Sequence, residues 1–179
     1  MKFNLINNIL IKKHNKALCK KYPFLKKYIY SSKKVNYQTT WEDDLPLGWR
    51  TAFCPQIWDE LKAILEKANY VNEFRFIQIK EKWGELRMYY SGIPSEIADE
   101  VYAWEEKYSQ LSTEKCIGCG QTVKYMTLGW ISYVCEECAQ NFGVVCIDVN
   151  DIEAYYHTPR EERNKLVKNF RKNNLTSLL

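Results

Sequence analysis

Acidic side chains are absent from the first 40 residues of this chain, although that stretch carries ten lysines. Residues 41–110 have the opposite bias, with eight basic and fourteen acidic side chains, and residues 111–179 carry eight of each. A basic head followed by an acidic middle predicts either an anionic partner or charge complementarity within the chain.

Histidine is nearly absent as well, since only His14 and His157 occur. The sequence has no Ser-His-Asp order, no phosphate-cradling glycine loop and no HExxH motif. Acid–base chemistry would have to use the charges of one predicted hairpin, which are equally well explained as solvated cross-strand pairs. These charges are Lys80, Glu81, Lys82, Glu85 and Arg87. An enzymatic role is therefore the less favoured interpretation.

Long apolar runs are also missing. None approaches the roughly 20 residues that a membrane-spanning helix needs, and polar residues between positions 7 and 13 interrupt the only early candidate for a signal peptide. Cysteines without a leader indicate a reducing, cytoplasmic compartment, where clustered cysteines bind metal more often than they form disulfides. Cys19, Cys54 and Cys146 stand far apart in the sequence, and no role is predicted for them.

The other four cysteines give the strongest chemical signal in the chain. Cys116, Cys119, Cys135 and Cys138 form the pattern C-x2-C-x15-C-x2-C. Each C-x2-C turn directs both sulfurs to one side, so two such pairs suit one tetrahedral zinc ion. Four thiolates leave no open coordination position, and we therefore expect one structural Zn²⁺ per chain. A redox-active C-x-x-C does not explain two pairs at this spacing, whereas iron in a rubredoxin-like site remains an alternative.

The residues around these cysteines predict a compact metal module. Gly118 and Gly120 suit a tight knuckle at the first pair. Residues 123–127 and 129–134 are able to form a β-hairpin that returns the chain to the second pair, where the acids after Cys135 favour a helix start. Knuckle, hairpin and helix in this order resemble a treble-clef or zinc-ribbon module.

Hydrophobic periodicity predicts helices over residues 55–68 and 97–111, and a basic helix after Thr158-Pro159. Residues 3–20 predict a basic amphipathic helix with two interpretations. It either lies on a membrane or another anionic surface, or it docks its apolar stripe on the body and leaves its lysines in water.

Shorter elements complete the predicted fold. Residues 22–30 predict a second short helix, residues 31–50 a long connection, residues 73–80 and 85–90 a β-hairpin, and residues 144–149 a short strand. The fold class is α+β: helices around a small antiparallel hairpin, with a C-terminal treble-clef or zinc-ribbon-like module. The predicted parts are a basic helical segment (1–40), an α+β body (41–113), the zinc-binding module (114–142) and a strand and helix extension (143–179).

Seven short motifs follow one another in a recognisable order. They are YPFL (22–25), GW (48–49), LKAIL (61–65), QIKEKWGELRMYY (78–90), CIGCG (116–120), GW (129–130) and CEEC (135–138). Over residues 21–139, the chain resembles an uncharacterised family of small bacterial and phage proteins with an IKEKxGxLRxY segment and a C-terminal four-ligand zinc site. In that family the last ligand is often His, where this chain has Cys138. The resemblance implies the architecture and a phage or mobile-element source, but no activity.

Two classes of binding function fit these features. The favoured one is an adaptor or inhibitor that acts on a host or phage protein, because an aromatic-rich body with a metal-stapled end suits protein recognition. The alternative is nucleic-acid binding through the basic C-terminal helix and the Lys-rich head, in particular Lys12, Lys13, Lys20 and Lys21.

The hairpin residues Trp83, Glu85, Arg87 and Tyr89 are the predicted interaction surface. An equally good interpretation is a structural hairpin whose tryptophan packs on the zinc module.

Overall fold

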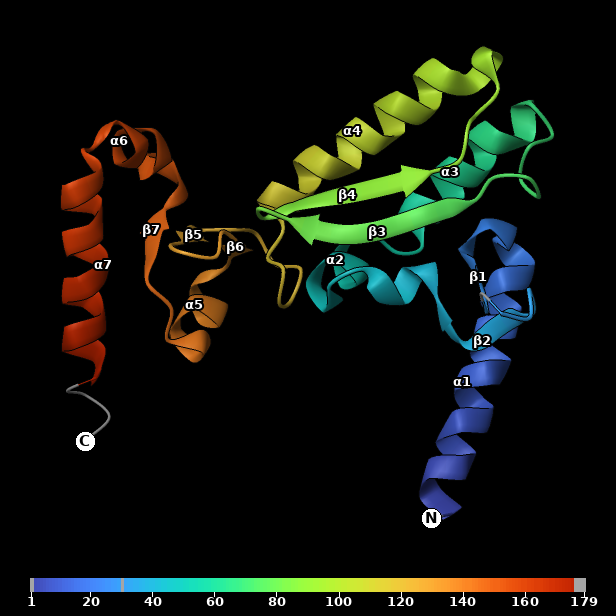
Figure 1. Cartoon of the computed structure of the whole chain (residues 1–179), viewed down its shortest axis with the longest axis horizontal. Coiled ribbons are helices and arrows are strands. Elements are labelled where there is room, and N and C mark those ends of the chain that lie inside the picture. The colour runs from blue at the N-terminus through green and yellow to red at the C-terminus, as the bar shows by residue number, and fades with distance from the viewer. Residues whose placement is uncertain (1, 30, 176–179) are drawn as a thin grey trace. The chain divides into compact units, whose positions relative to one another are not determined.

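Helices and three small antiparallel sheets make up the computed structural model of the chain, which describes residues 2–29 and 31–175 (Figure 1). The described residues divide into two compact units, each assembled from separate segments. Unit 1 comprises the described part of Met1–Pro46 with Phe53–Lys82 and Leu86–Ser109, and unit 2 comprises Leu47–Ala52, Trp83–Glu85 and the described part of Gln110–Leu179. No helix within the described ranges is long and apolar enough to cross a membrane.

Helix α1 (Lys2–Lys21) opens unit 1 and confirms the helix predicted over residues 3–20. It docks by its C-terminal half, where Asn15 and Cys19 are buried and the Asn15 amide donates to the Tyr37 carbonyl at 3.1 Å. Ile9 and Leu10 of the predicted apolar stripe are 58% and 57% exposed, so this part of the stripe does not pack on the body. The helix extends beyond the elements that would have covered this part of the stripe.

The region after α1 differs from the sequence prediction. The helix expected over residues 22–30 is wrong: a 3₁₀ turn (Pro23–Leu25) leads into strand β1 (Lys26–Tyr28). The connection expected over residues 31–50 is also wrong, because it contains β2 (Val35–Thr40), which pairs antiparallel with β1, and the start of helix α2 (Leu47–Phe53).

Helices α3 (Gln56–Lys67) and α4 (Ala98–Glu114) confirm the two helices predicted from periodicity. The predicted apolar positions Ile57, Leu61 and Leu65 of α3 are fully buried. The core of unit 1 is rich in aromatic rings, which meet edge-on or tilted with centroids 5.1–6.4 Å apart, a favourable geometry for their quadrupoles. These rings belong to Phe24, Trp58, Phe74 and Phe76.

Strands β3 (Phe76–Lys82) and β4 (Glu85–Tyr90) form the predicted hairpin. Leu86 and Met88 are buried and Tyr89 is exposed, as the alternation along β4 predicts. The loop consists of Trp83 and Gly84, with φ angles of +56° and +82°. Two consecutive positive φ angles are those of a type I′ turn, whose twist matches the flanking strands.

Unit 2 is built on a three-stranded antiparallel sheet with strand order β6-β5-β7. Strands β5 (Tyr125–Thr127) and β6 (Tyr133–Val134) confirm the predicted hairpin, and β7 (Cys146–Asp148) confirms the strand predicted within 144–149. The helices are α5 (Glu136–Phe142), α6 (Ile152–His157) and α7 (Arg160–Leu175), of which the sequence did not predict α6.

Candidate metal centre

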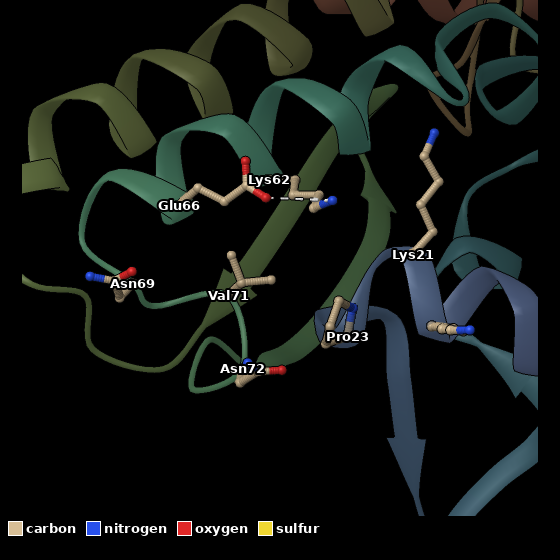
Figure 2. Close-up of a pocket in the computed structure, with 8 residues that line it drawn as sticks. Lys21, Pro23, Lys62, Glu66, Asn69, Val71 and Asn72 are labelled. Atoms are coloured by element: carbon tan, nitrogen blue, oxygen red, sulfur yellow. Dashed lines mark ion pairs between the residues drawn. The ribbon is translucent and has the colours of Figure 1, made fainter.

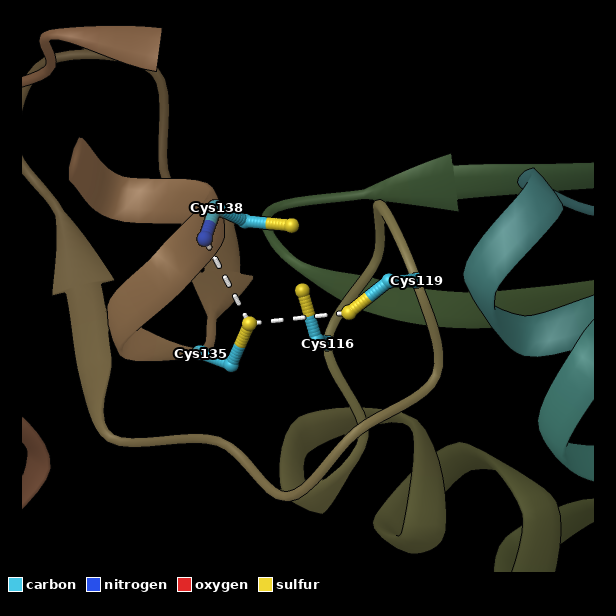
Figure 3. Close-up of side chains that lie close together, drawn as sticks. All are labelled: Cys116, Cys119, Cys135 and Cys138. Carbon is cyan, nitrogen blue, oxygen red and sulfur yellow. Dashed lines mark hydrogen bonds between the residues drawn. The ribbon is translucent and has the colours of Figure 1, made fainter. Parts of the chain in front are cut away.

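The four cysteines of the C-x2-C pairs lie close together and are able to bind one metal ion. Their Sγ atoms all lie within 4.8 Å of one another, and those of Cys119 and Cys135 are 3.5 Å apart (Figure 3). Four sulfurs bound to one ion at about 2.3 Å in a tetrahedron are about 3.8 Å apart. The donor atoms and their spacing therefore fit a thiolate-bound metal.

Two local structures position the sulfurs. Cys116 and Cys119 flank a tight loop in which the Gly120 amide donates to the Cys116 carbonyl at 2.8 Å, and Gly120 has a φ of +82°. Cys135 is the N-cap of α5, and its sulfur accepts a hydrogen bond from the Cys138 amide at 3.5 Å. Knuckle, strand pair and helix start thus occur in the predicted order.

The local field favours ionisation of one ligand in particular. Burial opposes ionisation of the Cys116 thiol, but hydrogen bonds from the backbone of Cys135, Cys119 and Gly118 outweigh it and lower its pKa to about 7. Burial raises the pKa of Cys138, and the neighbouring thiols raise it further. Clustered thiols resist joint ionisation, and a bound cation removes that repulsion.

Apolar side chains of unit 2 pack around the four cysteines. Val134 and Ala139 are buried with Cys116 and Cys135, and Tyr125 packs against them. The fifth cysteine of the unit, Cys146, also packs against this shell but lies outside the group of four. Such a shell limits solvent access to metal–sulfur bonds.

A segment far away in sequence closes over the knuckle. The Gly48 amide donates to the Ile117 carbonyl at 3.0 Å, and the Trp49 indole donates to the Lys115 carbonyl at 3.1 Å. A Cβ atom at Gly48 would lie only 2.0 Å from the Cys116 carbonyl oxygen. Glycine is therefore required where α2 begins, and the GW pair at 48–49 belongs to the metal module. The role of this pair depends on contacts with residues far away in the chain, such as Lys115, which is 66 positions from Trp49. The local sequence therefore contains no signal for it.

The hairpin tip also belongs to unit 2. A Cβ atom at Gly84 would lie 2.8 Å from the Tyr133 ring and 3.4 Å from a methyl group of Ile131. The tip therefore rests on the segment that leads into β6. Trp83 at this tip is 69% exposed and Trp130, directly before Ile131, is 77% exposed. Two large exposed rings thus lie on segments that touch.

A pocket of about 410 Å³ opens in the same unit. It is lined by Thr113, Glu114, Thr122, Val123, Tyr133, Val149 and Ile152. Tyr133 thus contributes both to this mainly apolar pocket and to the seat of the hairpin tip.

The predicted surface of the hairpin is distributed between the units. Trp83 and Glu85 belong to unit 2, whereas Arg87 and Tyr89 belong to unit 1, where the Lys80 ammonium lies 5.1 Å from the centre of the Tyr89 ring. Sequence analysis did not single out Trp130 as a binding residue. It appeared there only as part of the GW motif at 129–130.

The predicted basic residues Lys12, Lys13, Lys20 and Lys21 all lie on α1 and are exposed. Only Lys21 among these four forms an ion pair within the described ranges, with Asp59 at 2.9 Å.

No protein-family model, curated protein or solved structure matches this chain at a significant level.

Proposed function

We propose that the metal is zinc and that it has a structural role in a module of the treble-clef or zinc-ribbon kind. Support comes from the four converging thiolates, the knuckle that precedes a strand pair, and the second cysteine pair at a helix start. Four thiolates complete a tetrahedral zinc sphere, so no position is left for a substrate or a reactive water.

We further propose that the chain is a non-enzymatic binding protein, an adaptor or inhibitor of the phage or mobile-element type that acts on a host protein. The observation that carries this proposal is the pair Trp83 and Trp130, exposed by 69% and 77% on touching segments of unit 2. Tryptophan is enriched among the residues that dominate binding energy at protein interfaces. The neighbouring pocket lined by Tyr133 would accept an apolar side chain of the partner.

A double substitution, Trp83→Asn with Trp130→Ala, is expected to abolish stoichiometric capture of the partner from a host lysate. Asn tolerates the positive φ at position 83, so the turn should persist while the ring is lost. Loss of two anchor side chains weakens binding by about 2 kcal/mol each, or roughly a thousandfold together. The measurement is the amount of co-purified protein per immobilised chain.

Tyr102→Ala provides the matched control, because Tyr102 is an aromatic residue of unit 1 that is 55% exposed. It should leave capture unchanged. A wild-type protein that retains no stoichiometric partner, or a control that loses binding as strongly as the double variant, would contradict the proposal.

A further inference from the structure

The exposed face of α1 carries a stripe of lysines. Lys12, Lys16 and Lys20 follow one another at i, i+4 and i+8, and Lys13 lies beside them, so all four fall within an arc of about 100°. All four are exposed, and the helix docks through Asn15 and Cys19, which lie to one side of this arc. We call these four residues the lysine stripe. It extends for about 12 Å along the helix axis at 1.5 Å per residue.

The lysine stripe has no counter-charge of its own. Among the described residues none of its four members forms an ion pair, and α1 contains no acidic residue. The neighbouring lysines differ, since Lys21 pairs with Asp59 and Lys27 with Asp44. Like charges at i, i+4 destabilise an isolated helix. A polyanion bound along this face would remove that repulsion.

The lysine stripe ends at a pocket of about 460 Å³ in unit 1, shown in Figure 2. Its lining residues are Lys20, Lys21, Pro23, Lys62, Glu66, Asn69, Val71 and Asn72. The lining therefore includes three lysines and two asparagines, and Lys21 is paired with Asp59. Glu66 is the single carboxylate in the lining, and it lies 3.5 Å from the Lys62 ammonium. The net charge of the lining side chains is therefore positive, as is that of the lysine stripe.

The distribution of apolar side chains on α1 distinguishes two kinds of anionic partner, a membrane surface and a charged polymer. Ile9, Leu10 and Ile11 are exposed, but consecutive helical residues are about 100° apart and so point in three different directions. Ile9 lies in the same arc as Lys16 and Lys20. A membrane-surface helix needs its apolar residues gathered on the face opposite its cations, and α1 lacks that separation. A polymer with closely spaced fixed charges, such as a phosphodiester backbone, needs only the cations.

We propose that the lysine stripe and the adjoining pocket bind the phosphate backbone of nucleic acid, without preference for base sequence. This inference concerns unit 1 and is independent of the proposed protein-binding surface on unit 2. The proposed site is confined to unit 1, and the basic helix α7 of unit 2, whose first turn carries Glu161 and Glu162, serves as the comparison.

The test is fluorescence anisotropy of the full-length protein with a labelled DNA duplex at several salt concentrations. The triple variant Lys13→Gln, Lys16→Gln, Lys20→Gln is expected to lose at least about tenfold in affinity at low salt, and its salt slope should fall by about 3. Gln keeps helix propensity near that of Lys, so α1 should remain folded, which circular dichroism checks.

Two further variants separate binding at this site from attraction by net charge and from misfolding. The triple variant Arg160→Gln, Lys165→Gln, Lys168→Gln removes the same charge from exposed positions of α7 and should stay within about twofold of wild type. Glu66→Gln removes the carboxylate from the pocket and is expected to tighten binding about two- to threefold, a gain that misfolding does not produce.

Three results would overturn the proposal: an equal loss in the α7 variant, no binding at low salt, or binding to vesicles of anionic lipid or to polyglutamate but not to DNA. The first would indicate attraction by net charge alone, and the last would reassign the lysine stripe to a membrane or an acidic protein. Loss of DNA binding in the α1 variant with intact partner capture would separate this site from the surface around Trp83 and Trp130.

Discussion

Cys135→Ala is expected to reduce the zinc content from one ion per chain to near zero and to unfold unit 2. Cys135 supplies one of the four sulfurs and also caps α5, so both the coordination sphere and the helix start are lost. Apparent binding free energies of structural zinc are about 10–16 kcal/mol in zinc-finger peptides. Unit 2 has a small sheet whose β5 and β6 strands are only three and two residues long, so it has little else to replace that contribution. Cys119→Ala should behave in the same way.

Elemental analysis gives the zinc content, and hydrogen exchange of residues 116–148 gives the folding of the module. The matched control is Cys146→Ala, which removes a thiol that packs beside the site without belonging to the group of four. This control should keep one zinc ion and lose only about 1 kcal/mol of stability. A wild-type protein that is folded and free of metal would contradict the proposed structural role of the zinc ion.

Gly48→Ala should destabilise the metal module by about 3 kcal/mol or more, even though position 48 is distant in sequence from every cysteine. The new methyl carbon would lie 2.0 Å from the Cys116 carbonyl oxygen, 2.6 Å from that of Ile117 and 2.7 Å from the Gly120 nitrogen. All three obstacles are backbone atoms of the knuckle. Relief of the collision must therefore move the knuckle or detach the start of α2, and either change misplaces Cys116.

The measurement for Gly48→Ala is zinc retention against a competing chelator, together with thermal unfolding. Gly92→Ala is the control, because a Cβ atom there meets nothing within 4 Å and the φ angle is an ordinary one. It should be neutral or slightly stabilising. If Gly48→Ala retained zinc as strongly as this control, the close packing of α2 on the knuckle would be disproved.

Sequence analysis succeeded where the determining interactions are local. The spacing of Cys116–Cys138 predicts a cluster because each pair is formed by one turn of chain, and α3 and α4 are long enough for their apolar period to be unmistakable. The β3–β4 hairpin is predictable for the same reason, since Gly84 marks a turn between two alternating segments.

The failures lie where the local alternation is weak or where distant contacts decide the structure. Strands β1 and β2 are three and six residues long, and their pairing shifts in register between Lys26 and Lys27, so neither has a clear alternation. The spacing of apolar residues along α1 predicts a helix, but not whether any element extends far enough to cover Ile9 and Leu10. Contacts between segments far apart in the sequence also group residues 47–52 and 83–85 with the metal module in unit 2.

The tryptophan at the hairpin tip has a cost for the fold. Position 83 has a φ of +56°, a conformation that costs a residue with a bulky side chain about 1–2 kcal/mol and that Asn or Gly adopts readily. A chain optimised for stability alone would not keep a tryptophan there. The turn therefore holds an exposed indole at the expense of stability, and replacing Trp83 by Asn is expected to stabilise the hairpin.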